Sequence, residues 1–134
     1  MSKEHFNPPS LFQSLAHGFS QAVSSGPGRT VYISGQTAWN AEREIVGGND
    51  LERQTHEAFR NLKTAIEEAR GTIDDIVAIR IYVVNYDSKA GSIVGKVLRQ
   101  YFNAPKPPAS TWVGVQALAS PDFLIEIEAV AVIE

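Results

Sequence analysis

Residues 123–133 read FLIEIEAVAVI, and this stretch decides the fold. Its side chains alternate at a period of two, which predicts a β-strand. One face of the strand would carry Ile125, Ile127, Ala129, Ala131 and Ile133, and the other Leu124, Glu126, Glu128, Val130 and Val132. Apolar residues on both faces indicate a sheet that is covered on both sides.

A second stretch, residues 76–84 (IVAIRIYVV), shows the same two-faced pattern with Arg80 as its one charged residue. We expect Val77, Ile79, Ile81 and Val83 on one face and Ile76, Ala78, Arg80, Tyr82 and Val84 on the other. The sequence pattern predicts two helices, and two helices can cover only one face of the sheet. The other face would expose more apolar surface than a monomer usually tolerates, so we expect other subunits to bury it. The alternative is that the N-terminal segment covers it.

Two helices are predicted between the strands. The first carries an apolar stripe at helical spacing: Ala58, Phe59, Leu62, Ala65, Ile66 and Ala69. Asn49 and Glu52 fit a capping box at its start, and Gly71 fits a left-handed cap at its end. The second helix covers residues 88–102, although Gly91 and Gly95 weaken its helix propensity.

The remaining elements complete one domain over residues 1–134. We expect an extended lead-in over 1–18, a hairpin of strands 19–23 and 30–35, a proline-rich loop over 103–109, and a strand over 110–118. The order is β-β-α-β-α-β-β. This predicts an α+β fold with a mixed sheet and two helices on one face.

Composition excludes several functional classes. Lys and Arg number 12 against 15 Asp and Glu, a net charge of −3, which argues against nucleic-acid and membrane-surface partners. The absence of cysteine removes disulfides, thiolate nucleophiles and Cys-based metal sites, and the three histidines lack metal-ligand spacing. The polar start and the lack of a long apolar run predict a cytoplasmic protein.

Glu126 and Glu128 are the residues most suggestive of chemistry. Two positions apart on a strand, both carboxylates would point to the same face. Burial raises the pKa of a carboxyl group, and such a group suits proton transfer to water or to a leaving amine. Alternatively, one or both are solvated at a subunit edge or paired with an arginine such as Arg80.

Residues 11–134 resemble the Rid/YjgF family of reactive-intermediate imine and enamine deaminases. The resemblance is carried by six segments in order: residues 18–22 (GFSQA), 31–36 (VYISGQ), 54–63, 74–77 (DDIV), 107–109 (PPA) and 125–131 (IEIEAVA). It implies a homotrimer of chorismate-mutase-like subunits with three small-molecule clefts between neighbours. It also implies that Glu126 positions the attacking water, that the Ser34-Gly35 backbone contacts substrate, and that no metal or organic cofactor takes part.

The sequence departs from the deaminating branch at its substrate-gripping arginine, whose position is Ser110 here. A serine hydroxyl carries no charge and cannot form the bidentate pair that an arginine makes with a carboxylate. Trp112 stands where a small residue is common, Phe19 replaces a tyrosine, and Gly95 aligns with an asparagine often found near the ligand. Lys106 or Arg29 could supply a substitute cation.

Three functions follow from this comparison. The first is an enzyme that hydrolyses a small reactive imine or enamine, with Glu126 catalytic and Phe19, Ser34, Gly35, Ser110, Thr111 and Trp112 lining the cleft; activity on ordinary 2-imino acids is doubtful. The second is a non-catalytic small-molecule binder on the same trimer. The third, least favoured by the acidic balance, is a ribonuclease or translation inhibitor.

Overall fold

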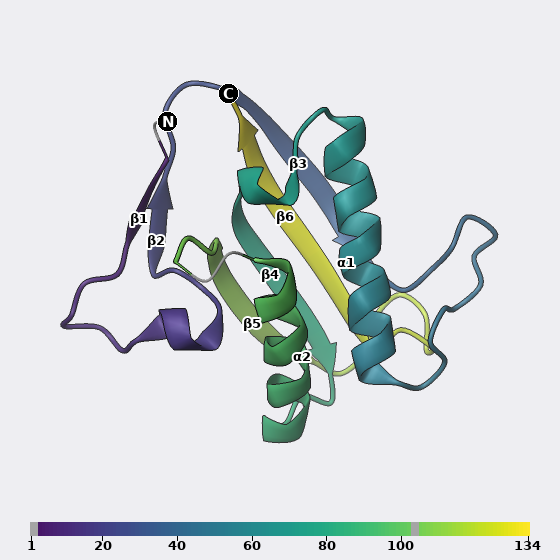
Figure 1. Cartoon of the computed structure of the whole chain (residues 1–134). Coiled ribbons are helices and arrows are strands. Elements are labelled where there is room, and N and C mark those ends of the chain that lie inside the picture. The colour runs from purple at the N-terminus through teal and green to yellow at the C-terminus, as the bar shows by residue number, and fades with distance from the viewer. Residues whose placement is uncertain (1–2, 103–104) are drawn as a thin grey trace.

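The computed structural model describes residues 3–102 and 105–134. Figure 1 shows a twisted sheet whose one face is covered by two helices. The elements are β1 (Glu4–Phe6), η1 (Ser14–His17), β2 (Ala22–Ser24), β3 (Arg29–Gln36), α1 (Leu51–Glu68), η2 (Ile73–Asp75), β4 (Ile76–Val84), α2 (Ser88–Tyr101), β5 (Ala109–Val115) and β6 (Ile125–Ile133). The predicted α+β class, with a mixed sheet and two helices on one face, is confirmed.

The main sheet has the strand order β3-β6-β4-β5. β6 pairs antiparallel with both β3 and β4, whereas β4 and β5 are parallel. A parallel pair needs a crossover connection, and α2 supplies it. The last strand of the chain therefore lies inside the sheet, which explains why both of its faces carry apolar residues.

The predicted hairpin of strands 19–23 and 30–35 is wrong. β2 pairs with β1, where Phe6 lies opposite Ala22, and β3 pairs with β6 instead. Pairing with β6 lets β3 place Ile33 in the core beneath α1, a burial that the short β2 could not provide. The lead-in is correspondingly structured, because it supplies β1 and η1. Residues 103–104 of the predicted proline-rich loop lie outside the described part of the chain.

The core lies between the helices and one face of the sheet. Ile79, Ile81 and Val83 of β4 point into it, as predicted. Ile76 is also buried there, contrary to the expected alternation, because the β4–β6 register shifts between Ile76 and Ala78. The helices contribute buried side chains of Ala58, Phe59, Leu62, Ile66, Val94, Val97 and Leu98.

The ends of α1 differ from the prediction at both caps. Asp50, and not Asn49, is the N-cap, and its carboxylate accepts from the Arg53 backbone N–H at 3.0 Å. At the other end Arg70 takes the left-handed conformation with φ 69°, while the Gly71 N–H donates to the Ile66 carbonyl at 2.9 Å. These bonds form a Schellman motif with a non-glycine residue at its left-handed position.

The opposite face of the sheet is open. Tyr32 on β3 is 80% exposed there. The β1–β2 pair lies beside the β5 edge, where Ser20 bridges to Ala109, and does not cross this face (Figure 1). Within the described residues the N-terminal segment therefore does not cover the face, which was the alternative to burial by other subunits.

Candidate functional site

Glu126 and Glu128 both point from β6 toward the open face. Glu126 lies opposite Tyr82, and Glu128 lies opposite Arg80. Glu128 accepts a short hydrogen bond from the Tyr82 hydroxyl, and its Oε1 lies 3.8 Å from Arg80 Nη1. That hydrogen bond, helped by partial desolvation, raises the pKa of Tyr82 above its ordinary value of 10.0. Glu128 is thus the paired carboxylate of the two.

The Glu126 carboxylate is the unpaired one. Across residues 3–102 and 105–134, it has no hydrogen-bond or ion-pair partner. It lines a hollow of about 280 Å³ together with Gly35, Tyr82, Leu118 and Glu128. A carboxylate with its lone pairs free at the wall of a hollow can accept a proton from a molecule bound there.

Gly35 is placed against this carboxylate by an irregularity in β3. Ile33 pairs with Ala129 and Gln36 with Ile127, so β3 has one extra residue between these pairs, which is a β-bulge. At the bulge a β-carbon on Gly35 would lie only 2.6 Å from Glu126 Cδ. Any side chain at position 35 would therefore displace the Glu126 carboxylate, and Ser34 is exposed beside it.

Ser110 and Trp112 lie on the helix side of β5. The Trp112 indole N–H donates to Ser110 Oγ at 2.7 Å, and a β-carbon on Gly95 of α2 would lie 3.4 Å from the indole ring. The large residue at 112 is therefore accommodated by the missing side chain at 95. Thr111, between them, points to the open face opposite Arg80.

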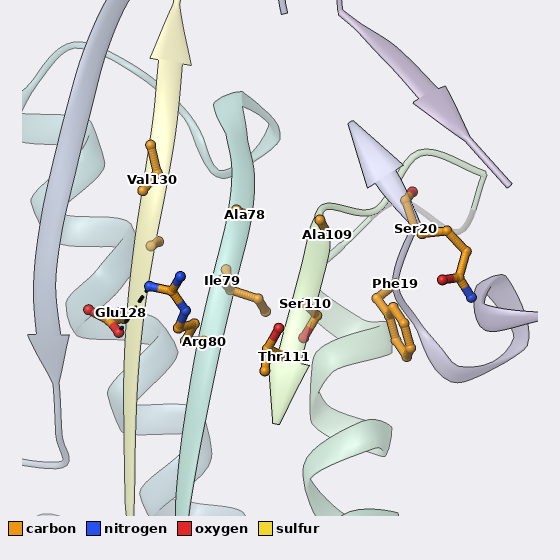
Figure 2. Close-up of a pocket in the computed structure, with 12 residues that line it drawn as sticks. Phe19, Ser20, Ala78, Ile79, Arg80, Ala109, Ser110, Thr111, Glu128 and Val130 are labelled. Atoms are coloured by element: carbon orange, nitrogen blue, oxygen red, sulfur yellow. Dashed lines mark ion pairs between the residues drawn. The ribbon is translucent and has the colours of Figure 1, made fainter. Parts of the chain in front are cut away.

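A cleft of about 250 Å³ lies at the β5 edge. It is lined on one side by Phe19, Ser110 and Thr111, and on the other by Arg80 and Glu128. Figure 2 shows Arg80 and Glu128 facing each other across β4 and β6, with Phe19 beyond the β5 edge. Phe19 and Trp112 also line a larger cleft of about 470 Å³ that runs along α2.

The structure thus divides the predicted site residues into two groups. Ser34, Gly35 and Glu126 lie on β3 and β6. Phe19, Ser110, Thr111 and Trp112 lie at the β5 edge, on the far side of β4 in the strand order. None of the three clefts described above is lined by both Glu126 and Phe19.

The two cations suggested as substitutes for the missing arginine are positioned differently. Arg29 donates to the Ala69 carbonyl at 2.8 Å, at the end of α1 and on the β3 edge of the sheet. Burial lowers the pKa of the His5 imidazole, and the positive charges of Lys3 and of the nearby Lys106 lower it further. The clefts instead contain Arg80 and Arg99. Arg80 was visible in the sequence as the one charge in its strand, whereas no sequence signal distinguished Arg99.

Two structural findings bear on the other site classes. The described residues contain no cluster of three or more His, Asp or Glu side chains that could hold a metal ion. No helix in that part of the chain is long and apolar enough to cross a membrane.

Comparison with known proteins shows the family. The sequence model of the family described as "Endoribonuclease L-PSP" matches residues 12–133. The structure of YyfB, a Rid-family protein of unknown function from Yersinia pestis, is 41% identical with a TM-score of 0.95, covering 99% of this chain and 100% of that one. The chain belongs to this family, the Rid/YjgF family, as its sequence predicted.

Two further relatives carry more specific names. A 2-iminobutanoate/2-iminopropanoate deaminase from Dermatophagoides farinae is 32% identical over 116 residues, which cover 87% of this chain and 86% of the relative. A RutC family protein from Pyrococcus abyssi is 34% identical over 114 residues, covering 84% of each. Sequence similarity to a deaminase supports imine deamination as an activity of the family.

Proposed function

We propose that this protein hydrolyses a small reactive imine or enamine, with Glu126 as the catalytic group. The observation that carries the proposal is the position of the Glu126 carboxylate, unpaired at the wall of a hollow and in close contact with the Gly35 backbone. Neighbouring Glu128 cannot serve equally well, because Tyr82 and Arg80 already engage it.

The reaction follows from the carboxylate's freedom to accept a proton. Water adds to the carbon of the C=N bond while one of its protons passes to Glu126, and the nitrogen takes up a proton from solvent to become an amine. Glu126 then returns its proton to that nitrogen, the C–N bond breaks so that ammonia leaves, and the hydroxyl group releases its proton to solvent as the carbonyl forms. The sum is imine plus water giving carbonyl plus ammonia. A positioned general base of this kind contributes about 10²–10⁴-fold to the rate.

The two groups of site residues support a cleft between subunits. Glu126 and Gly35 lie on one side of β4, and Phe19 and Trp112 on the other. A second copy packed on the open face would bring the Glu126 group of one subunit to the β5 edge of its neighbour. A homotrimer with three such clefts, as the family resemblance implies, also buries the exposed Tyr32.

Imine hydrolysis can be measured with an amino-acid oxidase that generates 2-imino acids in the presence of semicarbazide. Active protein suppresses formation of the semicarbazone. We expect Glu126→Gln to abolish the suppression, and Glu68→Gln to preserve it, because Glu68 is an exposed residue at the end of α1. Full activity in Glu126→Gln would refute the proposed role.

A non-catalytic binder is the second candidate, and Ser110 favours it. The Ser110 hydroxyl carries no charge and already accepts the Trp112 indole N–H. A protein that binds a small carbonyl compound equally well with glutamate or glutamine at 126, and hydrolyses no imine, would fit this function. A ribonuclease is disfavoured by the net charge of −3, and RNA binding at low salt would be its test.

A further inference from the structure

The larger cleft runs along α2, between this helix, β5 and the N-terminal segment. Its volume is about 470 Å³, and it extends from Ser88 in the first turn of α2 to Arg99 near the last. The eleven residue steps from Ser88 to Arg99 rise about 16 Å along the helix, so the cleft is longer than a three-carbon imino acid. The cleft therefore has room for a ligand larger than a three-carbon imino acid.

The floor of the cleft is made by two glycines one turn apart on α2. A β-carbon on Gly95 would lie 3.3 Å from Arg99 Nη1 and 3.4 Å from the Trp112 ring. A β-carbon on Gly91 would collide with the Tyr86 hydroxyl. Glycine disfavours helices, yet here it lets the side chains of Tyr86 and Trp112 lie close against the surface of α2. These are the same glycines that weakened the sequence-based prediction of the helix.

The walls of the cleft are aromatic. Phe12 and Phe19 meet edge to face with ring centroids 5.9 Å apart, and Trp112 lies on the β5 side. The Trp112 indole N–H is already bonded to Ser110, so the indole presents mainly its apolar surface. An aromatic ring bound in this cleft could pack against these aromatic side chains in edge-to-face or offset-stacked orientations, which are the favourable ones.

The charge of the cleft is positive. Arg99 lines it, and its guanidinium makes no hydrogen bond or ion pair within residues 3–102 and 105–134. No Asp or Glu is among the described residues that line this cleft. Arg80 differs, because Glu128 lies 3.8 Å from its guanidinium and offsets its charge.

We propose that this cleft binds an aromatic 2-imino acid, whose carboxylate is held by Arg99 and whose ring lies between Phe19 and Trp112. The inference rests on the proposed function, because Phe19 and Trp112 belong to the same inter-subunit site. Arg99 then supplies the positive charge that selects a carboxylate ligand, a charge that Ser110 cannot supply. A guanidinium can bind the carboxylate through two parallel hydrogen bonds, as a lysine could not.

The test uses phenylpyruvate, the stable 2-oxo acid that hydrolysis of an aromatic imino acid would release, and isothermal titration calorimetry on the whole protein. We expect phenylpyruvate to bind at least tenfold more tightly than pyruvate, and Arg99→Gln to weaken phenylpyruvate binding at least tenfold. Lys89→Gln is the matched control, because Lys89 is an exposed cation on α2 outside the cleft. Affinity in this variant should equal that of the native protein.

Three results would overturn the inference: no saturable binding of phenylpyruvate, equal affinity in Arg99→Gln, or a loss of binding in Arg80→Gln of the same size as in Arg99→Gln. Glu126→Gln separates the inference from the proposed function. In one outcome, phenylpyruvate binding depends on Arg99 and persists in Glu126→Gln, but the native protein hydrolyses no imine. This outcome supports the proposed binding cleft and refutes the proposed enzymatic activity. In the opposite outcome, the native protein hydrolyses imines, but phenylpyruvate binding is unchanged in Arg99→Gln. This outcome supports the proposed enzymatic activity and refutes the role of Arg99 in the cleft.

Discussion

Gly35 and Glu126 approach each other so closely that no other residue fits at position 35 without moving the carboxylate. A β-carbon there would lie 2.6 Å from Glu126 Cδ and 2.8 Å from its Cγ. The bulge in β3 produces this contact, because it lets the strand backbone approach β6 at the residue where the candidate catalytic group stands. The relationship links an irregularity of the fold directly to the site.

Gly35→Ala should therefore reduce activity more than stability. The added methyl group meets the end of a flexible side chain, which can rotate away at little cost to the fold. We expect imine hydrolysis to fall at least tenfold, while the urea unfolding midpoint changes little. The semicarbazone assay and urea denaturation measure the two effects. A native rate in Gly35→Ala would show that the position of the carboxylate does not matter.

The Tyr82–Glu128 hydrogen bond should make stability depend on alkaline pH. The bond to Glu128 raises the pKa of Tyr82 above 10.0, so the neutral phenol is favoured in the folded state. Its contribution is fully present below the unfolded pKa of about 10 and is lost as pH rises through the folded pKa. We expect native protein to exceed Tyr82→Phe in free energy of unfolding at pH 7–9, with the difference shrinking above pH 10.

Urea denaturation at a series of pH values measures this difference. Titration of phenolate absorbance gives an independent reading, because the absorbance lost in Tyr82→Phe should titrate above pH 10. Tyr86→Phe is the comparison, since no hydrogen bond joins the Tyr86 hydroxyl to a carboxylate within the described residues. A difference between native protein and Tyr82→Phe that grows above pH 10 would contradict the assignment.

The open sheet face should be an assembly surface. We expect native protein to have a mass near three times the 14.6 kDa of one chain by light scattering. Tyr32→Asp places a charge on this face, and burying an unpaired carboxylate between subunits costs several kcal/mol. The variant should therefore dissociate to the monomer mass.

Leu11→Asp is the control for assembly. Leu11 is also an exposed apolar residue, 48% accessible, but it belongs to the segment between β1 and η1 and not to a strand of the main sheet. This variant should keep the native mass. A trimer that survives Tyr32→Asp, or a native protein that is monomeric, would show that the open face is not the interface.

The end of α1 offers a prediction about stability alone. Arg70 occupies the left-handed region at φ 69°, which glycine adopts without strain, so Arg70→Gly should stabilise the protein by about 0.5–1 kcal/mol. Gly71→Ala should destabilise it by about 1–3 kcal/mol, because the new methyl group would overlap Ile133 Cδ1 at 2.6 Å. Urea denaturation distinguishes the two, and a gain in stability from Gly71→Ala would disprove the close approach.

The regular elements were the most predictable part of the fold. β4 begins and ends at the residues expected from its apolar pattern, and the apolar stripe from Ala58 to Ile66 faces the core. The predicted hairpin was wrong because burial under α1 decides which strand β3 pairs with. That burial depends on contacts between segments far apart in sequence. The left-handed cap predicted at Gly71 lies one residue earlier, at Arg70, and Gly71 instead lies where a β-carbon would meet the Ile133 side chain.

The sequence by itself determined the family, the α+β class and the two carboxylates of β6, because strand periodicity and local motifs are read within a few residues. Only the tertiary structure decided which carboxylate is free. Tyr82 and Arg80 come from another strand, and their contact with Glu128 depends on the register of β4 against β6. The tertiary structure also brings Arg99 and Phe19 to the same cleft. These residues are 80 positions apart, and no sequence motif links them. A contact between distant segments depends on how the whole chain packs, which no short stretch of sequence encodes.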